Sequence, residues 1–229
     1  MNRMWMFGDS FVSPLNANYD EDYHPDWTWT KQLATKLNLQ TRIIAQPGIS
    51  NQWISHEIIN FYDEMEIGDT VVIVTTELNR NWLFFEKPSL SNLYMWGLSE
   101  FVGEKQFKII EAYASEFYKQ QGLLNVLHYE WFLHWCRSKL SSKVRLCLLP
   151  GFDTTDIHDT TDSSLALKDI DEQEFEQLMD KPVVDKRMNH MSKENHTILA
   201  DKVYKFLTEN EKIDLSTDFL NSETIQPVR

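Results

Sequence analysis

The sequence predicts an α/β protein in which a parallel sheet of at least four strands lies between two layers of helices. Short apolar runs alternate with segments of helical periodicity along the 229 residues, a pattern typical of parallel strands joined by crossover helices. One run, Val71-Val72-Ile73-Val74, is apolar at every position, as a central strand covered on both faces must be. With 42% hydrophobic residues, the chain can bury one substantial core.

The predicted elements alternate between strand and helix through most of the chain. Strands are expected at 2–7, 40–45, 70–75 and 144–149, and helices at 27–37, from about 54 to 61, at 104–140 and at 192–207. Asp26 is the expected N-cap of the first helix. The expected domain covers residues 1–208, and residues 209–229 form a polar C-terminal tail.

The segment from 104 to 140 has the longest helical periodicity, and it is expected as one helix or as two with a break near Gly122. Its spacing places one set of apolar side chains on or near one stripe, namely Ile110, Ala114, Phe117, Leu124, Trp131 and Trp135. Residues 152–180 follow the fourth strand and contain ten acidic residues against the single base Lys168. We expect them to form an acidic surface loop.

Charge and composition exclude several classes of partner. The formal charge is −13 and the basic residues are scattered, whereas binding of nucleic acid requires a basic face. No apolar run is long enough to span a bilayer, and the apolar start Met4 to Phe7 is too short for a signal peptide. We therefore expect a cytoplasmic protein without membrane insertion, with Cys136 and Cys147 as buried thiols.

Two separated blocks carry side chains suited to nucleophilic catalysis. Ser10 follows the first strand in Gly8-Asp9-Ser10, at the edge where open α/β sheets bind their ligands. His190 opens the segment of the last helix. Because a serine hydroxyl is a weak nucleophile at neutral pH, it needs an imidazole to take its proton. The two blocks together predict a serine nucleophile with a histidine base.

These blocks resemble those of the SGNH, or GDSL-type, hydrolase superfamily. The matching residues are Gly8-Asp9-Ser10, Pro47-Gly48-Ile49-Ser50-Asn51 and the run from His190 to His196. The resemblance covers about residues 1–208 and implies a flavodoxin-like sheet of four to five strands, with neither metal nor organic cofactor. It implies that Ser10 is the nucleophile, that His190 is the base, and that the amides of Ser10 and Gly48 bind the oxyanion. The arrangement also resembles phage-encoded members, for which a virion-associated location is expected.

The third block departs from the family pattern. The family has Gly-x-Asn after the third strand, whereas this chain has Thr75-Thr76-Glu77-Leu78-Asn79-Arg80 without a glycine. Asn79 is the expected side-chain donor to the oxyanion, and Asn81 and the Thr76 hydroxyl are the alternatives. Losing one such donor typically lowers turnover about 100- to 1,000-fold.

The acid of the expected triad departs as well. Arg187 occupies the family's acid position, three residues before the histidine, and arginine cannot accept the imidazole N–H. Asp185 is the expected acid. The alternatives are a Ser–His dyad oriented by a backbone carbonyl or by Asn189, and an acid at Asp153 or Asp156.

Several other side chains have two interpretations. His24, close to Asp20 and Asp22, fits an acidic surface loop better than a metal site. His128 and His134 are expected to pack against the helices' neighbours, whereas His196 within the last helix is expected either to pack or to face solvent. Four tryptophans near the functional edge could stack on sugar rings or pack in the core: Trp27, Trp29, Trp53 and Trp82.

The predicted function is cleavage of O-acyl esters, preferably short ones such as acetyl groups on a carbohydrate, through an acyl-enzyme on Ser10. If the acidic loop lies at the entrance, neutral esters should be better substrates than anionic ones. Since both departures count against activity, the alternative is a weak or inactive protein of the same fold that binds carbohydrate or has a structural role in a phage. Acyl length and oligomeric state stay open.

Overall fold

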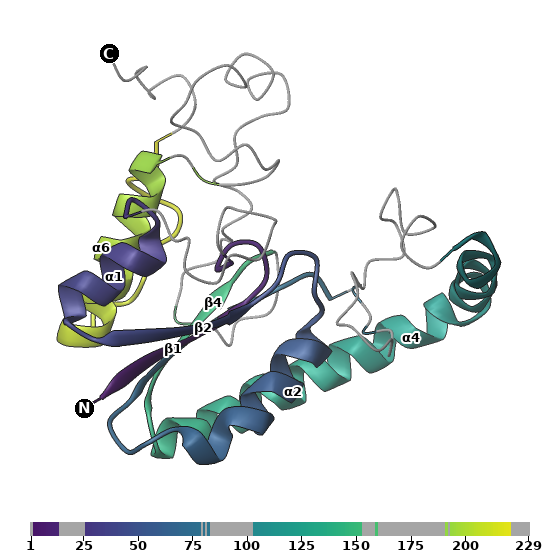
Figure 1. Cartoon of the computed structure of the whole chain (residues 1–229), viewed down its shortest axis with the longest axis horizontal. Coiled ribbons are helices and arrows are strands. Elements are labelled where there is room, and N and C mark those ends of the chain that lie inside the picture. Colours follow the sequence, from purple (N-terminus) through teal and green to yellow (C-terminus); the bar gives the residue numbers. More distant parts are fainter. Residues whose placement is uncertain are drawn as a thin grey trace.

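The computed structural model contains one parallel sheet between two helical layers (Figure 1). It describes residues 2–13, 26–78, 80, 82, 103–152, 159, 191 and 193–220. The strands are β1 (Arg3–Gly8), β2 (Gln40–Ala45), β3 (Thr70–Thr75) and β4 (Arg145–Pro150). They pair in the order β2-β1-β3-β4, and every pairing is parallel. The predicted α/β sandwich is confirmed.

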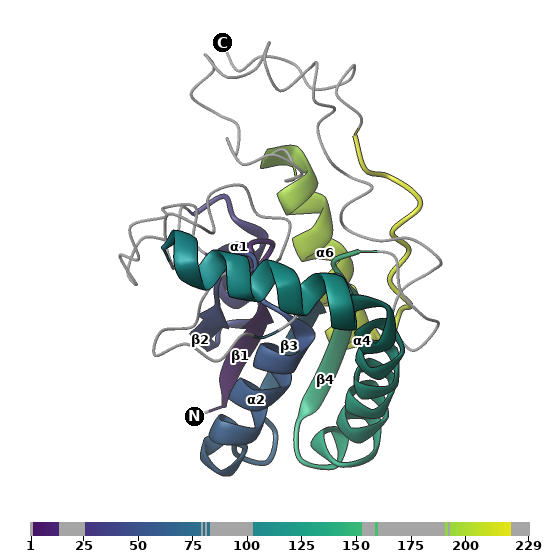
Figure 2. The ribbon, with the colours of Figure 1, turned by 90° about the vertical axis from the view of Figure 1, so that its right-hand side faces the viewer.

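The helices cover the sheet in two pairs, as Figures 1 and 2 show. α1 (Trp29–Leu37) and α6 (Lys193–Glu209) pack on one face, and α2 (Asn51–Phe61) and α4 (Glu104–Ser138) pack on the other. Two short 3₁₀ turns, η1 (Tyr62–Glu64) and η2 (Leu140–Ser142), follow α2 and α4. The periodic segment from 104 onward forms a single helix that continues through Gly122.

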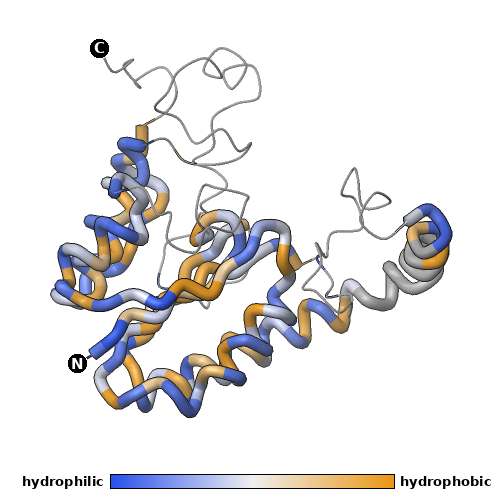
Figure 3. The backbone as a smooth tube through the Cα atoms, viewed as in Figure 1, coloured by the Kyte–Doolittle hydropathy of each residue, from blue (hydrophilic) through white to orange (hydrophobic). Residues whose placement is uncertain are grey.

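Alternation along the strands divides the core into two clusters. In β1, Met4 and Met6 face α1 and α6, whereas Trp5 and Phe7 face α2 and α4. The same alternation runs through β3 and β4, because successive side chains of a strand point to opposite faces. The hydropathy colouring in Figure 3 shows the apolar strands at the centre of the molecule.

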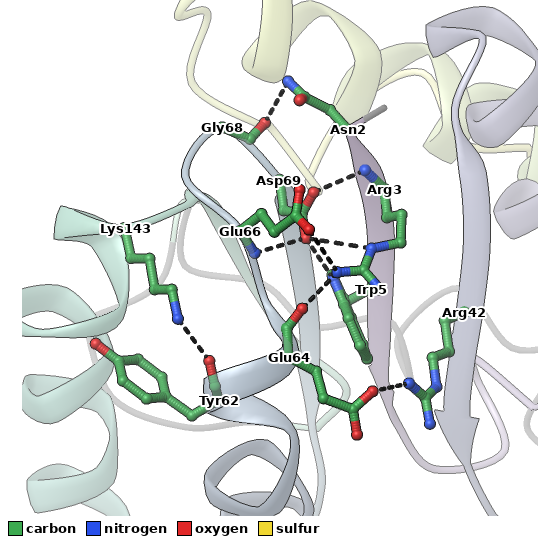
Figure 4. A network of polar contacts seen from close by, with 10 residues as sticks. All are labelled: Asn2, Arg3, Trp5, Arg42, Tyr62, Glu64, Glu66, Gly68, Asp69 and Lys143. Carbon is green, nitrogen blue, oxygen red and sulfur yellow. Dashed lines mark hydrogen bonds and ion pairs between the residues drawn. The ribbon is translucent and has the colours of Figure 1, made fainter.

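Asp69 joins β1 to β3 at the amino-terminal edge of the sheet (Figure 4). Its buried carboxylate accepts hydrogen bonds from the backbone N–H of Arg3 at 2.8 Å, the backbone N–H of Glu66 at 3.0 Å and the Trp5 indole at 2.8 Å. Burial alone would raise the pKa of Asp69, but these three donors and the Arg3 guanidinium hold it below its usual value. The network stabilises the edge opposite the predicted site.

Asp159 and Ile213, from segments later in the chain, form backbone hydrogen bonds alongside β4. The Asp159 N–H donates to the Leu148 carbonyl at 3.0 Å, and the Asp159 carbonyl accepts from the Ile213 N–H at 3.0 Å. The Asp159 carboxylate is buried, accepts from the Leu148 N–H at 2.8 Å and pairs with Arg137. This member of the expected acidic loop therefore contributes structure and not an exposed charge. The remaining residues of that loop after Phe152 lie outside the described residues.

The beginning of the expected polar tail contributes to the core. Ile213 and Leu215 are buried in the cluster beneath α1 and α6. The Asn195 side chain on α6 also forms two hydrogen bonds, of 2.8 and 2.9 Å, with the backbone of Leu220. Residues 209–220 thus pack against the domain that was expected to end at 208.

Two details of the helices differ from the prediction. Asp26 is exposed and does not cap α1; the N-cap is Thr28, and the Trp29 N–H donates to His196 Nδ1 at 3.2 Å. On α4, Leu124 and Trp131 are exposed, contrary to the prediction. The buried stripe is instead Asn125, Tyr129, Phe132, Leu133 and Cys136. Both differences arise because tertiary packing, and not local spacing, selected the partner of each helix.

Both cysteines are free and buried, as predicted. Burial raises the pKa of both thiols above the usual range. In the part of the chain that the structure describes, no helix is long and apolar enough to cross a membrane.

Candidate active site

The site lies where the strand order reverses direction. The chain passes from β1 to β2 on one side and then returns to β3 on the other side of β1, and ligands of open α/β sheets bind at the carboxyl ends of the strands beside such a reversal. Those ends carry Gly8-Asp9-Ser10 after β1 and Thr76 after β3. The predicted nucleophile therefore lies at the topological switch point.

Ser10 occupies the first position of a short helical turn. The Asp9 carbonyl accepts from the N–H groups of Val12 at 3.0 Å and Ser13 at 2.9 Å, and the Asp9 Oδ1 accepts from the Phe11 N–H at 3.1 Å. These bonds do not use the N–H of Ser10, and its side chain is half-buried. A Cβ on Gly8 would lie 2.6 Å from Val12 Cγ2, so only glycine lets the turn fold back this closely.

A buried ion pair joins this turn to the loop after β3. Asp9 is fully buried, and its Oδ2 accepts from Arg80 Nη1 at 2.9 Å and from the Thr76 hydroxyl at 2.8 Å. The Arg80 side chain is 10% exposed, and its guanidinium lies 4.9 Å from the centre of the Phe152 ring, just after β4. One carboxylate thereby fixes the segments that follow two neighbouring strands.

The segment after β2 is tied to the same edge. Ser50 caps α2 by accepting from the Trp53 N–H at 3.3 Å. The Asn51 side chain pairs with the backbone of Thr76, donating to its carbonyl at 2.8 Å and accepting from its N–H at 2.9 Å. Gly48 has a φ of 73°, and the Gln46 N–H donates to the Gly8 carbonyl at 3.3 Å. Gln46 is thus hydrogen-bonded to the last residue of β1, and Gly48 lies two residues further along the chain, close to the Ser10 turn.

A second set of hydrogen bonds joins α6 to the Ser10 turn through Trp29. The Trp29 indole donates to the Phe11 carbonyl at 2.8 Å, and the Trp29 backbone N–H donates to His196 Nδ1 on α6 at 3.2 Å. Met191, the residue after His190, is 1% exposed and belongs to the same hydrophobic cluster as Phe11 and Val12. Of the two alternatives for His196, packing and solvent, the structure shows packing, since the side chain is buried.

The structure settles one of the alternatives for the third oxyanion donor. The Thr76 hydroxyl has a single proton, and it donates that proton to buried Asp9, so it is directed away from any substrate. The other residues predicted for the site, with their alternatives, lie outside the described residues: Asn79, Asn81, Asp153, Asp156, Asp185, Arg187, Asn189, His190 and the loop group Asp20, Asp22 and His24.

The four tryptophans named in the sequence analysis pack in the core or against histidine rings. Trp29 and Trp53 are buried in the core, while Trp27 contacts the edge of the His196 ring at 5.3 Å between centroids. Trp82 contacts His56 at 4.7 Å.

On α4, His128 lies with Nε2 3.5 Å from Ser55 Oγ, and burial lowers its pKa. His134 is exposed, so the prediction that it packs was wrong. Among the described residues there is no group of histidine, cysteine and carboxylate side chains that could hold a metal ion.

Sequence reasoning missed the structural role of Asp9, Arg80 and Asn51. A usable signal was present, because opposite charges follow two strands that a flavodoxin-like order makes neighbours. Charged residues at such positions are buried only when they are paired.

No family model and no curated protein matches the chain. Among solved structures, a proposed lipolytic protein of the G-D-S-L family from Desulfitobacterium hafniense is similar at 11% identity, 90% coverage of this chain, 100% of that chain and a TM-score of 0.36. A member of the lipolytic G-D-S-L family from Veillonella parvula has 13% identity, coverages of 91% and 99% and a TM-score of 0.37. A proposed arylesterase from Agrobacterium tumefaciens has 8% identity, the same coverages and a TM-score of 0.41. At these low similarities, the function of this chain must be inferred from its own residues.

Proposed function

We propose that the chain is a serine hydrolase that cleaves carboxylic esters through an acyl-enzyme on Ser10. The observation that supports this most directly is the placement of Ser10 at the switch point, half-buried, on a turn fixed by the buried carboxylate of Asp9. Such fixed geometry is what nucleophilic catalysis requires, because a small displacement of the reacting atoms costs orders of magnitude in rate.

In the proposed reaction, the Ser10 hydroxyl oxygen attacks the acyl carbon while His190 takes its proton. The oxyanion that forms accepts hydrogen bonds from the N–H groups of Ser10 and Gly48 and from the Asn79 side chain. Collapse breaks the ester bond, and the leaving alcohol receives the proton from His190. Water then attacks the acyl-enzyme by the same route, and Asp185 orients the imidazole throughout.

Two features of the described residues support these roles. The turn at Asp9 leaves the Ser10 N–H out of its own hydrogen bonds, so this donor can serve an oxyanion. His190 precedes Met191, which shares a hydrophobic cluster with Phe11, and α6 is hydrogen-bonded through Trp29 to the residue after Ser10. The base is therefore expected on the same side of the edge as the nucleophile.

The preferred substrates in this proposal are neutral esters with short acyl groups, such as acetylated carbohydrates. The formal charge of −13 supports the preference for neutral over anionic substrates, because a field of one sign repels ligands of that sign, most strongly at low salt. Comparing hydrolysis of a neutral ester and an acidic analogue of equal acyl length at two salt concentrations tests this step.

Labelling with a fluorophosphonate probe, followed by peptide mapping, tests the proposal. Wild type should be labelled at Ser10, and Ser10→Ala should not be labelled. Ser55→Ala is the matched control, since Ser55 also lies 3.5 Å from a histidine nitrogen but on α2, away from the switch point; its labelling should equal that of wild type. Absence of labelling in all variants would favour the alternative, a binding protein that keeps the fold without the chemistry.

The acid is tested separately by turnover of a short-chain ester. If Asp185 orients His190, Asp185→Asn should lower turnover about 10⁴-fold, as is typical when a triad acid is neutralised. A dyad oriented by a backbone carbonyl or by Asn189 predicts little change.

A further inference from the structure

Four large apolar side chains are exposed on consecutive turns of α4, on the face away from the sheet. They are Leu123 at 66% exposure, Leu124 at 57%, Leu127 at 53% and Trp131 at 74%. Leu124, Leu127 and Trp131 recur at i, i+3 and i+7, the spacing of a helix face that packs on another helix. We name these four residues the outer face of α4.

The outer face belongs to a helix that is much longer than the sheet requires. α4 has 35 residues, which correspond to about 52 Å, whereas a six-residue strand spans about 20 Å. Figures 1 and 2 show that α4 bends, and that its amino-terminal part beyond the bend is turned across the rest of the helix. Among its described side chains, every buried one lies at Asn125 or later, while Ile109 is 61% exposed. Since helices depend mainly on tertiary packing for stability, a surface that covers the outer face would stabilise α4.

Charge distinguishes α4 from the rest of the chain. The helix carries four acidic and four basic residues, so its formal charge is zero, although the whole chain carries −13. Two copies of this protein repel each other over most of their surfaces, but they can meet along α4 without net repulsion. The neutral helix with an apolar face is thus a favourable place for a second copy to bind.

We propose that α4 forms the interface of a homodimer, with a two-fold axis perpendicular to the helix near Leu127. In this antiparallel arrangement Leu127 packs against Leu127 of the partner subunit, and Leu124 packs against Trp131 of the partner subunit. The four side chains leave about 500 Å² of each copy in contact with water, so pairing would bury about 1,000 Å², which is close to the lower limit of specific interfaces. Contacts from the rest of the helix would add to this area.

The oligomeric state in solution tests the proposal with the full chain. Light scattering after gel filtration should give twice the mass of one chain at micromolar concentrations, with stronger association at high salt. Leu127→Glu places two like charges on the axis and should weaken association about 100-fold or more. Ile67→Glu is the matched control, because Ile67 is 86% exposed but lies outside α4; its dimer should equal that of wild type.

Cross-linking locates the interface independently. Leu127→Cys should form a disulfide-linked dimer under mild oxidation, because a residue on a two-fold axis lies next to its own copy. Ile67→Cys should not, and the two native cysteines are buried. A wild-type chain that stays monomeric up to about 100 µM, well above the dissociation constants of stable dimers, would overturn the proposal. So would a dimer that Leu127→Glu leaves intact.

Discussion

Replacing Arg80 with methionine should destabilise the fold by about 3 kcal/mol, because the change leaves the carboxylate of Asp9 buried without its cation. Asp9 is fully buried and Arg80 nearly so, with 2.9 Å between Oδ2 and Nη1. Methionine keeps the contact with the Phe152 ring, which the guanidinium makes at 4.9 Å. The expected loss therefore reports the polar contacts of the guanidinium, which besides Asp9 include Glu77 Oε2 at 3.4 Å and the Ile49 carbonyl at 3.5 Å, and not the packing.

The magnitude follows from what Asp9 retains. Breaking a buried pair from one side typically costs 3 to 5 kcal/mol, roughly, when the remaining charge is uncompensated. Asp9 keeps two donors, the Phe11 N–H and the Thr76 hydroxyl, so we expect the lower end of that range. Asp9→Asn removes the charge instead and should cost about 2 kcal/mol through weaker hydrogen bonds.

Urea unfolding of wild type, both single variants and the double variant measures the coupling between the two side chains. The double variant should be about 2 kcal/mol more stable than the sum of the single changes predicts, since neither partner is then left alone. Lys36→Met is the control, because the Lys36–Asp201 pair is also short, at 2.8 Å, but exposed, and should cost about 0 to 1 kcal/mol. Additive effects of the Asp9 and Arg80 changes would refute the reasoning.

Three further predictions concern stability and reactivity. Because the pKa of Asp69 is lowered in the fold, its carboxylate stabilises the fold at pH values above the ordinary carboxyl range. This contribution is lost as acid titrates the native carboxylate below about pH 4. The free energy of unfolding, measured with urea, should therefore fall less steeply with decreasing pH in Asp69→Asn than in wild type. Gly122→Ala should raise the free energy of unfolding by roughly 0.5 to 1 kcal/mol because a helical Cβ there meets open space, whereas Gly151→Ala should lower the melting temperature because its Cβ would lie 2.3 Å from the Thr75 carbonyl oxygen. Cys136 and Cys147 should react with a thiol reagent only on unfolding, since burial keeps both thiols protonated and inaccessible; fast labelling of the native chain would contradict this.

The strands were the most predictable part of the fold. β2 and β3 begin and end at the predicted residues. β3 is buried at all six positions, and a strand buried on both faces leaves a continuous apolar run in the sequence. The cap of α1 was not predictable in the same way. Asp26 has the chemistry of a cap but lies two residues before Thr28, the observed N-cap, and the Trp29 N–H is satisfied by His196, which is 167 residues away. The local sequence shows that the first N–H groups of α1 need an acceptor, but the acceptor, His196, is set by the packing of α6 on α1.

The same distinction applies to α4 and to the site. Periodicity identified a long helix and placed Leu124 and Trp131 on or near one apolar stripe, but both are exposed, because a helix with two apolar faces does not show from sequence which one meets the sheet. At the site, Ser10 and Gly48 were predicted from their motifs, and the structure brings their strands together. The Asp9–Arg80 pair joins residues 71 positions apart, so it could be found only by combining the two charges with the strand order of a flavodoxin-like sheet.

The polar groups at this edge divide into two kinds, and the division bears on how the site acts. The buried side chains bond among themselves or to nearby backbone: Asp9 to Thr76 and Arg80, Asn51 to the Thr76 backbone, and Ser50 to the start of α2. Each would cost about 1 to 3 kcal/mol if left unpaired, so none can turn toward a substrate without destabilising the fold. Among the described residues at this edge, half-buried Ser10 has an amide that lies outside these bonds, so it can serve a ligand at no such cost. A rigid polar frame that holds the Ser10 turn in one place supplies the fixed positioning that nucleophilic catalysis requires.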